Sequence, residues 1–186
     1  MARIMQIIST CERRGAEIHT RSLSKVFARL GHTVVLVYPP GEYAGEFRSL
    51  EKVGVTCIEG PFTCNWLKTI TRIRSLIKKY SIDLIHSHVH MADMHSTFAR
   101  IGISRVTQVT TIHSTIRLWE CGFFSKARMY LYASIAYLFI DRIFPVSEGA
   151  AQLTREDFFF ARRKVIPLLN AIDFEQVRVD DANCRH

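Results

Sequence analysis

Residues 4–38 read IMQIISTCERRGAEIHTRSLSKVFARLGHTVVLVY, and this stretch decides the fold. The apolar run 4–8 is typical of a strand that is buried on both faces, and a polar loop follows at 9–15. Residues 17–30 then place apolar side chains at helical spacing, and Gly31 ends the expected helix. A second apolar run occupies residues 33–38, so the stretch predicts a strand, a helix and a second, parallel strand.

The same alternation continues along the rest of the chain. We expect strands at residues 4–8, 33–38, 55–58, 83–86, 106–112, 142–146 and 164–168. The expected helices lie between and after them, at residues 17–30, 47–53, 66–80, 92–101, 125–139 and 149–160. Strands joined through helices form right-handed crossovers, which predicts an α/β fold, a Rossmann-like three-layer sandwich around a parallel sheet of six or seven strands.

The length of the chain, 186 residues, suits one domain with a core of its own. We assign residues 1–178 to this domain and the polar residues 179–186 to a tail. The N-terminus lacks the layout of a signal peptide, and the apolar stretch 129–140 is shorter than the about 20 residues that a membrane-spanning helix needs. We therefore expect a cytoplasmic protein with at most peripheral contact to the inner face of a membrane.

The net charge of +8 favours anionic partners, such as acidic lipid headgroups or phosphorylated substrates. No signature of a nucleic-acid-binding module accompanies this charge, so we do not expect nucleic acid as a partner. The cysteines are odd in number and form no CxxC pair, which argues against a disulfide framework or a zinc knuckle and for reduced thiols. They are Cys11, Cys57, Cys64, Cys121 and Cys184.

Ligands of parallel α/β sheets bind beyond the carboxyl ends of the strands, so the loops there are the places to look for chemistry. In the first of these loops, Gly15 lets the backbone approach a ligand, and the helix that follows offers free N–H groups to a phosphate. The loop is neither GxGxxG nor a P-loop, and its spacing alone favours a simple turn. After the strand expected at 142–146, Ser147 fits the N-cap of the last helix.

Histidines gather at two of the strand ends. His113 follows the strand 106–112, where it either hydrogen-bonds a ligand in the cleft or simply caps the strand. His86, His88 and His90 alternate along an extended segment, so their imidazoles could converge on a metal ion, with Asp93 and His95 nearby in sequence. A metal-dependent hydrolase is therefore a minor alternative, although no later Asp or His is well placed to complete a two-metal site.

Five segments, taken in order, resemble the N-terminal domain of family 4 glycosyltransferases, which have the GT-B fold. Two departures from that family's pattern are Arg14, where a first glycine is usual, and Ala171, where the family has another glycine. The segments are Arg14-Gly15-Ala16-Glu17 with Gly31-His32-Thr33-Val34, then Asp83-Leu84-Ile85-His86-Ser87-His88, Thr110-Thr111-Ile112-His113, Asp141 to Glu148, and Val165-Ile166-Pro167 with Asn170 to Phe174.

The resemblance implies transfer of a sugar from a nucleotide-sugar donor to a hydroxyl of a saccharide or lipid-linked acceptor, with retention at the anomeric carbon. It implies neither a bound metal nor another cofactor. The nucleotide-sugar counts as a co-substrate. The implied roles are catalytic for His113, which holds the donor sugar, donor-binding for Gly15, Ala16, Ser147 and Glu148, and acceptor-binding for Glu17 and His88.

The family's second domain carries the nucleotide pocket, and the chain ends where we expect that domain to begin. We therefore expect a chain that is inactive by itself, either truncated or completed by a partner that supplies the C-terminal lobe. A non-catalytic subunit that binds an acceptor or activates a partner is the alternative. The basic amphipathic helix expected at 66–80, with Phe62 and the aromatic helix at 123–139, raises the further alternative of contact with a membrane surface.

Overall fold

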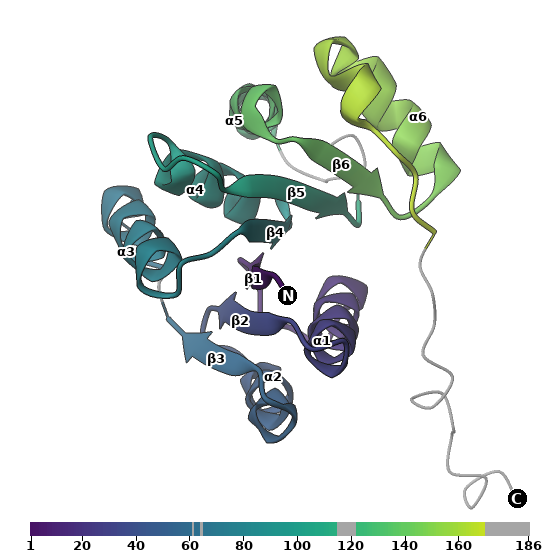
Figure 1. Ribbon diagram of the computed structural model, residues 1–186. Helices are drawn as coiled ribbons and strands as arrows, with labels where there is room; N and C mark the ends of the chain where they lie inside the picture. The colour runs from purple at the N-terminus through teal and green to yellow at the C-terminus, as the bar shows by residue number, and fades with distance from the viewer. Residues whose placement is uncertain (61, 64, 115–121, 170–186) are drawn as a thin grey trace, which may run out of the picture.

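The computed structural model describes residues 1–60, 62–63, 65–114 and 122–169, and its centre is one parallel sheet (Figure 1). The sheet has six strands in the order β3-β2-β1-β4-β5-β6, which confirms the α/β prediction. The strands are β1 (Arg3–Ile8), β2 (Thr33–Tyr38), β3 (Thr56–Glu59), β4 (Leu84–His88), β5 (Thr107–Ile112) and β6 (Arg142–Pro145). The expected tail at 179–186, the motif residues 170–174, and Cys64, Cys121 and Cys184 lie outside the described residues.

Helices cover both faces of the sheet. Figure 1 shows α3, α4 and α5 on one side and α1 and α6 on the other. The α-helices are α1 (Gly15–Arg29), α2 (Ala44–Arg48), α3 (Trp66–Lys79), α4 (His90–Arg100), α5 (Phe123–Phe139) and α6 (Glu148–Asp157), and the 3-10 helices are η1 (Ser49–Val53) and η3 (Phe159–Lys164). In the described ranges, no helix combines the length and the apolar character that crossing a membrane requires.

The seventh strand predicted at 164–168 is wrong. Val165 forms only an isolated parallel bridge to Ile143, and the N–H groups of Ile166 and Leu168 donate to the carbonyls of Ile143 and Pro145, both at 2.9 Å. A bridge between Pro145 and Pro167 would need an N–H from one of them. Because proline has no N–H, the ladder ends after one bridge.

Two aspartates lock the amino ends of neighbouring strands together. Asp83, just before β4, accepts from the backbone N–H of Arg3 at 2.9 Å and from its guanidinium at 2.7 and 3.0 Å. Asp141, just before β6, accepts from the backbone N–H of Gln108 at 2.8 Å and pairs with Arg100 at 3.4 Å. The first clamp ties β4 to β1 and the second ties β6 to β5.

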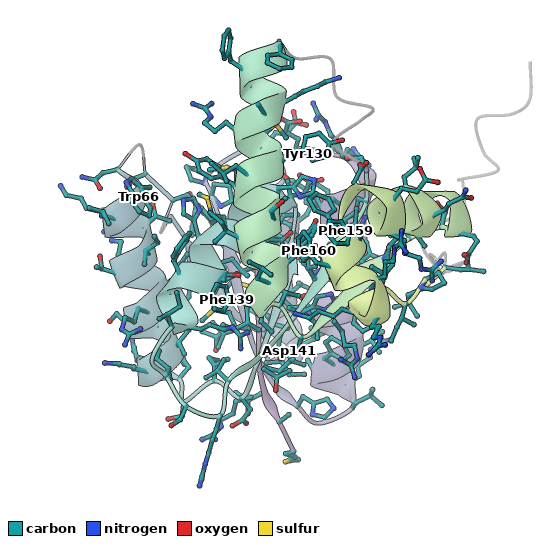
Figure 2. All side chains as sticks on the ribbon, turned by 90° about the horizontal axis from the view of Figure 1, so that it is seen from above. Trp66, Tyr130, Phe139, Asp141, Phe159 and Phe160 are labelled. Carbon is teal, nitrogen blue, oxygen red and sulfur yellow. The ribbon has the colours of Figure 1, made fainter. Side chains whose placement is uncertain are left out.

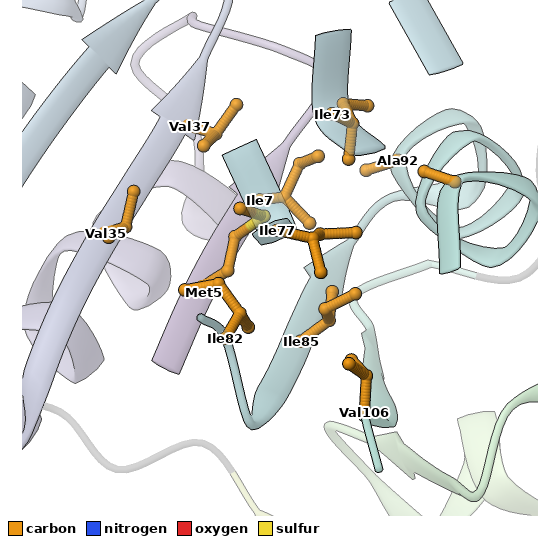
Figure 3. Packing of buried hydrophobic residues seen from close by; sticks show 11 residues of the cluster. Met5, Ile7, Val35, Val37, Ile73, Ile77, Ile82, Ile85, Ala92 and Val106 are labelled. Atoms are coloured by element: carbon orange, nitrogen blue, oxygen red, sulfur yellow. The ribbon is translucent and has the colours of Figure 1, made fainter. Parts of the chain in front are cut away.

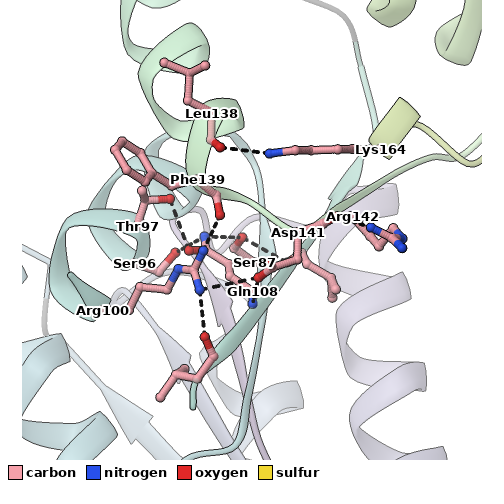
Figure 4. A network of polar contacts seen from close by, with 12 residues as sticks. Ser87, Ser96, Thr97, Arg100, Gln108, Leu138, Phe139, Asp141, Arg142 and Lys164 are labelled. Carbon is pink, nitrogen blue, oxygen red and sulfur yellow. Dashed lines mark hydrogen bonds and ion pairs between the residues drawn. The ribbon is translucent and has the colours of Figure 1, made fainter. Parts of the chain in front are cut away.

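The two faces of the sheet have different cores. Met5 and Ile7 of β1 point to the α3 and α4 side, where they pack with Ile73, Ile77 and Ile85 (Figure 3). Further along the same face, between α4 and β5, the core is polar. The side chain of Gln108 bonds Ser96 at 2.8 Å and Thr97 at 3.1 Å (Figure 4). The alternate β1 residues Gln6 and Ile8 point to the opposite face of the sheet, which α1 covers. Gln6 is therefore a polar side chain buried between the sheet and α1.

Gly41, in the loop after β2, sits directly against the loop after β1. A Cβ at Gly41 would lie 2.4 Å from the carbonyl oxygen of Cys11 and 2.7 Å from its Cβ. The same carbonyl accepts from the backbone N–H of Tyr43 at 3.2 Å. The two loops therefore hold each other in place only because residue 41 has no side chain.

Gly41→Ala should destabilise the protein by about 1–3 kcal/mol, because the added methyl group has no room and the two loops must separate. The matched control is Gly45→Ala in α2, where a Cβ meets nothing within 4 Å. That change should be neutral or stabilising by up to about 1 kcal/mol, since alanine favours a helix. Urea unfolding of both variants measures the difference, and equal stabilities would contradict the close approach of the loops.

Candidate functional site

A polar pocket of about 700 Å³ lies at the carboxyl ends of β1 and β2. It is lined by residues 9–14 of the first loop and 39–42 of the second. The order of the sheet reverses between β1 and β4, so the loop after β1 borders both this pocket and the point of reversal. Such a reversal is where ligands of open α/β sheets bind.

Helix α1 begins at the edge of this pocket, with Gly15 and Ala16 as its first residues. The first N–H groups of a helix have no acceptor within it, and the N-cap residue Arg14 provides no side-chain cap. A Cβ at Gly15 would meet nothing within 4 Å, so the space in front of the helix start is open. Arg13 and Arg14 line the pocket beside it together with Glu12 and Glu42, and Arg14 pairs with Glu12. The free N–H groups of the helix start are therefore what suits an anion here.

Glu17, predicted to contact an acceptor, is buried at 1% exposure. Its Oε1 accepts from the backbone N–H of Glu12 at 3.2 Å, which holds the first loop in place. Its Oε2 has no partner among the described residues, although it is buried. Contact with an acceptor stays a prediction, and the contact that the structure shows is to the loop.

Three histidines from separate elements meet beside the start of α1. His88, at the end of β4, approaches His113 with Nδ1 3.4 Å from Nε2. The ring of His19 in α1 stands edge-on to both, with centroids 5.1 Å from His113 and 5.9 Å from His88. The first turns of α1 and the predicted catalytic residue His113 therefore lie together at one rim of the sheet. His113 is half-buried, whereas His88 is fully buried beneath it.

The hydrogen bonds of Gln6 determine which ring nitrogens of this cluster carry a proton. Its amide oxygen lies 2.7 Å from Nε2 of His88, and its amide nitrogen lies 3.4 Å from Nδ1 of His86. An amide oxygen only accepts, so Nε2 of His88 carries the proton, and Nδ1 of the neutral ring accepts from Nε2–H of His113. His86 accordingly donates from Nε2 to the hydroxyl of Thr111 at 2.7 Å. This chain of bonds leaves Nδ1 of His113 unprotonated, as a hydrogen-bond acceptor.

Burial keeps these imidazoles neutral. Burial, with a smaller contribution from neighbouring histidines, lowers the pKa of His86 to about 3 and the pKa of His113 to about 4. The pKa of His88 is lowered well below its ordinary value by the same causes. His19 has a lowered pKa from burial, and its Nε2 is buried without a partner among the described residues. At neutral pH the cluster therefore offers hydrogen bonds and not positive charge.

The three alternating histidines do not converge. His86 and His88 are turned to Gln6, whereas His90 begins α4 and lies 3.2 Å from the hydroxyl of Tyr137. In the described part of the chain, no group of three or more His, Cys, Asp or Glu side chains is arranged to hold a metal ion. Nothing in this geometry favours the metal-dependent hydrolase.

Val89, between His88 and His90, has a strained backbone. Its φ is 73°, in the left-handed region that a β-branched residue rarely adopts. It also lines a small hollow shared by His90, Asp93 and His113. Strain at such a place is typical of functional sites, where the surrounding packing holds an unfavourable conformation.

Ser147 and Glu148 lie at the carboxyl end of β6, next to β5. Ser147 caps α6 as predicted, because its Oγ accepts from the N–H of Ala150 at 3.1 Å. Glu148 is exposed and pairs with Arg155 at 3.0 Å. Neither lines the hollow at His113 or the pocket at the first loop. Their predicted contact with a donor stays a prediction.

Gln6, His19, Gly41 and Val89 are part of the site but were not predicted. Gln6 did leave a signal, since it is the one polar residue of the apolar run 4–8. His19 follows Gly15 by one helical turn, so it projects from the same end of α1. Nothing in the sequence shows the contact at Gly41 or the backbone angle of Val89.

The sequence profile of Glycosyltransferase Family 4 matches residues 13–176. Among solved structures, a glycosyltransferase from Rickettsia africae has a TM-score of 0.72 at 19% identity, over 97% of this chain and 46% of that chain. HepE from Anabaena, in complex with UDP-glucose, has a TM-score of 0.72 at 14% identity, over 94% of this chain and 45% of that chain. MnaA from S. aureus, with UDP, has a TM-score of 0.68 at 18% identity, over 97% and 47%.

These likenesses establish the fold, and the chain spans about half the length of the compared structures. A search of curated proteins found no match to this sequence.

Acidification should destabilise the protein. The pKa is about 3 for His86 and about 4 for His90 and His113, all lowered chiefly by burial. The pKa of an unfolded histidine is about 6.5. Below that pH these histidines bind protons in the unfolded chain but stay neutral in the folded chain. Each such histidine removes up to about 1.4 kcal/mol of stability per pH unit, until the pH reaches its folded pKa.

Asp93 acts in the opposite direction, because burial raises its pKa to about 7. As the pH falls, its carboxylate therefore takes up a proton in the folded state at a higher pH than in the unfolded state, which stabilises the fold. Asp93→Asn removes this opposing contribution, so its stability should fall more steeply than that of the parent between about pH 7 and about pH 5. Urea unfolding at several pH values measures both slopes. A free energy of unfolding that stays level over this range in both proteins would refute the buried neutral cluster.

The tautomers are open to direct measurement. In ¹⁵N-labelled protein at neutral pH, long-range ¹H–¹⁵N spectra should show His88 and His113 protonated at Nε2 and bare at Nδ1. Gln6→Leu removes the acceptor for His88, so the ring signals of His88 and His113 should both change. A parent spectrum with the proton of His113 on Nδ1 would contradict the hydrogen-bond order.

Proposed function

This chain belongs to Glycosyltransferase Family 4, and we propose that it is the acceptor-side half of an enzyme that transfers a sugar from a nucleotide-sugar to a hydroxyl acceptor, with retention. One observation carries the proposal. A neutral, half-buried His113 stands beside the uncapped start of α1, at the point where the strand order reverses. This arrangement supports a site at which an acceptor of hydroxyl protons would adjoin an anion-binding helix start, the two groups that a sugar phosphate needs.

The donor's diphosphate would lie in front of Gly15 and Ala16. There the helix N-terminus and the side chain of Arg13 would supply positive potential, whereas Arg14 pairs with Glu12. As the sugar leaves, negative charge grows on the diphosphate, and fixed positive dipoles stabilise that charge without a bound metal. HepE and MnaA were solved with UDP-glucose and UDP respectively, which supports a uridine nucleotide as the first donor to try.

His113 would hold the transferred sugar through its bare Nδ1, which can accept a bond from a sugar hydroxyl. Gln6 would act on the sugar only through His88 and His113, by fixing their rings and protons, and the acceptor-binding role of His88 stays a prediction. Glu17 would contact the acceptor through Oε2, the oxygen that has no partner among the described residues. Ser147 and Glu148 would meet the donor from the neighbouring strand end.

The nucleotide pocket itself would belong to a second lobe. The compared structures are about twice the length that this chain matches, and the proposal assigns that lobe to the same protein or to a separate partner. The chain on its own would then bind ligands weakly and transfer no sugar. A non-catalytic subunit that only binds acceptors shares this expectation, so the donor contact is what the test must detect.

Titration of the ¹⁵N-labelled chain with UDP-glucose should shift the amide signals of Gly15 and Ala16, with a dissociation constant on the order of 1 mM or weaker. Gly15→Asp should abolish these shifts without loss of stability, because a carboxylate at a helix start stabilises the helix but repels a phosphate. The matched control is Gly45→Asp at the start of α2, where a side chain also has open space.

Two results would overturn the proposal. Robust sugar transfer by the chain alone would show an autonomous enzyme. Nucleotide-sugars that cause no shift at the start of α1, with acceptors that bind, would favour the non-catalytic subunit.

A further inference from the structure

The outward side of α5 is apolar along its whole length. Phe124, Leu131 and Leu138 recur at heptad spacing and are 87%, 58% and 59% exposed, and we call them the α5 stripe. The opposite side of the helix, with Ala133 and Tyr137, packs into the core. Figure 2 shows α5 in front of the rest of the molecule, with no described element over it. An outer helix normally turns a polar face to solvent, so the stripe indicates a partner.

The charges of α5 are unevenly placed. Its charged residues, Lys126 and Arg128, both lie in the first half of the helix, and its sequence contains no Asp or Glu. The helix dipole disfavours cations near the first turn and favours them in the last turn, which has none. The helix therefore has a basic half and an uncharged half.

These two halves fit each other when two copies of α5 run antiparallel. With Leu131 at the two-fold axis, Phe124 of each copy faces Leu138 of the other, because both lie seven residues from the axis. Lys126 then approaches the last turn of the other helix, where the dipole favours a cation. A parallel pair would instead place the two basic halves against each other.

The exposed area is sufficient for a dimer. A large apolar side chain offers on the order of 150–200 Å². Phe123 and Phe139, at the two ends of α5, are 80% and 50% exposed and extend the stripe. Two facing copies would bury roughly 600 Å² each, about 1,200 Å² in total, which is the lower limit of a stable specific interface. A hollow of about 620 Å³ between α4 and α5, lined in part by Met91 and Ile135, gives side chains of the second copy a groove to enter.

We propose that the chain forms a symmetric dimer in which the α5 helices of two copies pack antiparallel through the α5 stripe, centred on Leu131. A two-fold interface requires a surface that is complementary to itself, and α5 meets this requirement in both its apolar side chains and its charges. A lipid surface or a second lobe would not require the two halves of one helix to match. The dimer needs neither sugar nor nucleotide, so it stands or fails independently of the proposed function.

Sedimentation equilibrium of the full chain, with a reductant present, tests the dimer. The parent should show a monomer–dimer equilibrium with a dissociation constant on the order of 10 μM. Leu131→Lys puts two like charges at the axis and should weaken the dimer by at least about tenfold. The matched control is Val26→Lys, at a residue 46% exposed on α1, on the other side of the sheet in Figure 1, which should dimerise as the parent does. Thermal unfolding followed by circular dichroism checks that both variants fold.

An exchange of charges tests the antiparallel order. Phe124→Glu and Leu138→Lys should each weaken dimerisation by about tenfold or more, because each variant buries a charge opposite an apolar side chain. Mixed in equal amounts, the two variants should pair at least about tenfold more tightly than either does alone. The introduced carboxylate and ammonium then face each other at one end of the interface, and the other end keeps the parent contact.

Three results would overturn the proposal. A chain that stays monomeric up to about 0.3 mM would exclude the dimer, and binding of that monomer to lipid vesicles would assign the stripe to a membrane. A dimer that Leu131→Lys leaves intact would use another surface. A mixture that pairs no more tightly than the separate variants would contradict the antiparallel order.

Discussion

The pairing of β1 with strands on both sides is the constraint on which the site depends. Parallel pairing with β2 and with β4 sets Gln6 beside both Leu36 and His86, and Ile8 beside His88. The amide of Gln6 therefore reaches two imidazoles of the next strand, and the loop after β1 opens where the strand order reverses. A one-residue slip of this register would turn Gln6 or the histidines to the opposite face and dissolve the cluster.

Unfavourable features accumulate around the same strand ends. Within the described residues, three of the five buried side-chain atoms without a partner, Ser9 Oγ, Glu17 Oε2 and His19 Nε2, belong to the junction of β1 and α1, and the other two belong to His95 of α4. Val89 adds backbone strain at the end of β4. A buried polar atom without a partner lowers stability, so a fold under selection for stability alone would not gather several in one place. Their concentration there is the physical sign of a site shaped for a ligand.

The sequence predicts the fold well because β1 and β2 are short apolar runs and the helices α1 and α3 have visible apolar stripes. It fails at 164–168, where the apolar run is present but Pro145 and Pro167 lack the N–H groups that a ladder needs. For the site, it predicts the loops but not the depth of each side chain. Glu17 and His88 read as cleft residues in the sequence, yet their neighbours in space bury both, and the proximity of Gly41 to Cys11 depends on a contact between separate loops.

The motifs shared with the family serve two separate purposes, one at each end of a strand. Asp83 and Asp141 stand at the amino ends of β4 and β6, where they tie each strand to its neighbour. His88 and Ser147 stand at or just beyond the carboxyl ends of the same strands, on the rim that would meet a ligand. A match to the aspartates is therefore evidence for the fold alone, whichever reaction the protein performs. Evidence for chemistry has to come from the carboxyl ends, where the neutral His113 and the open start of α1 lie together.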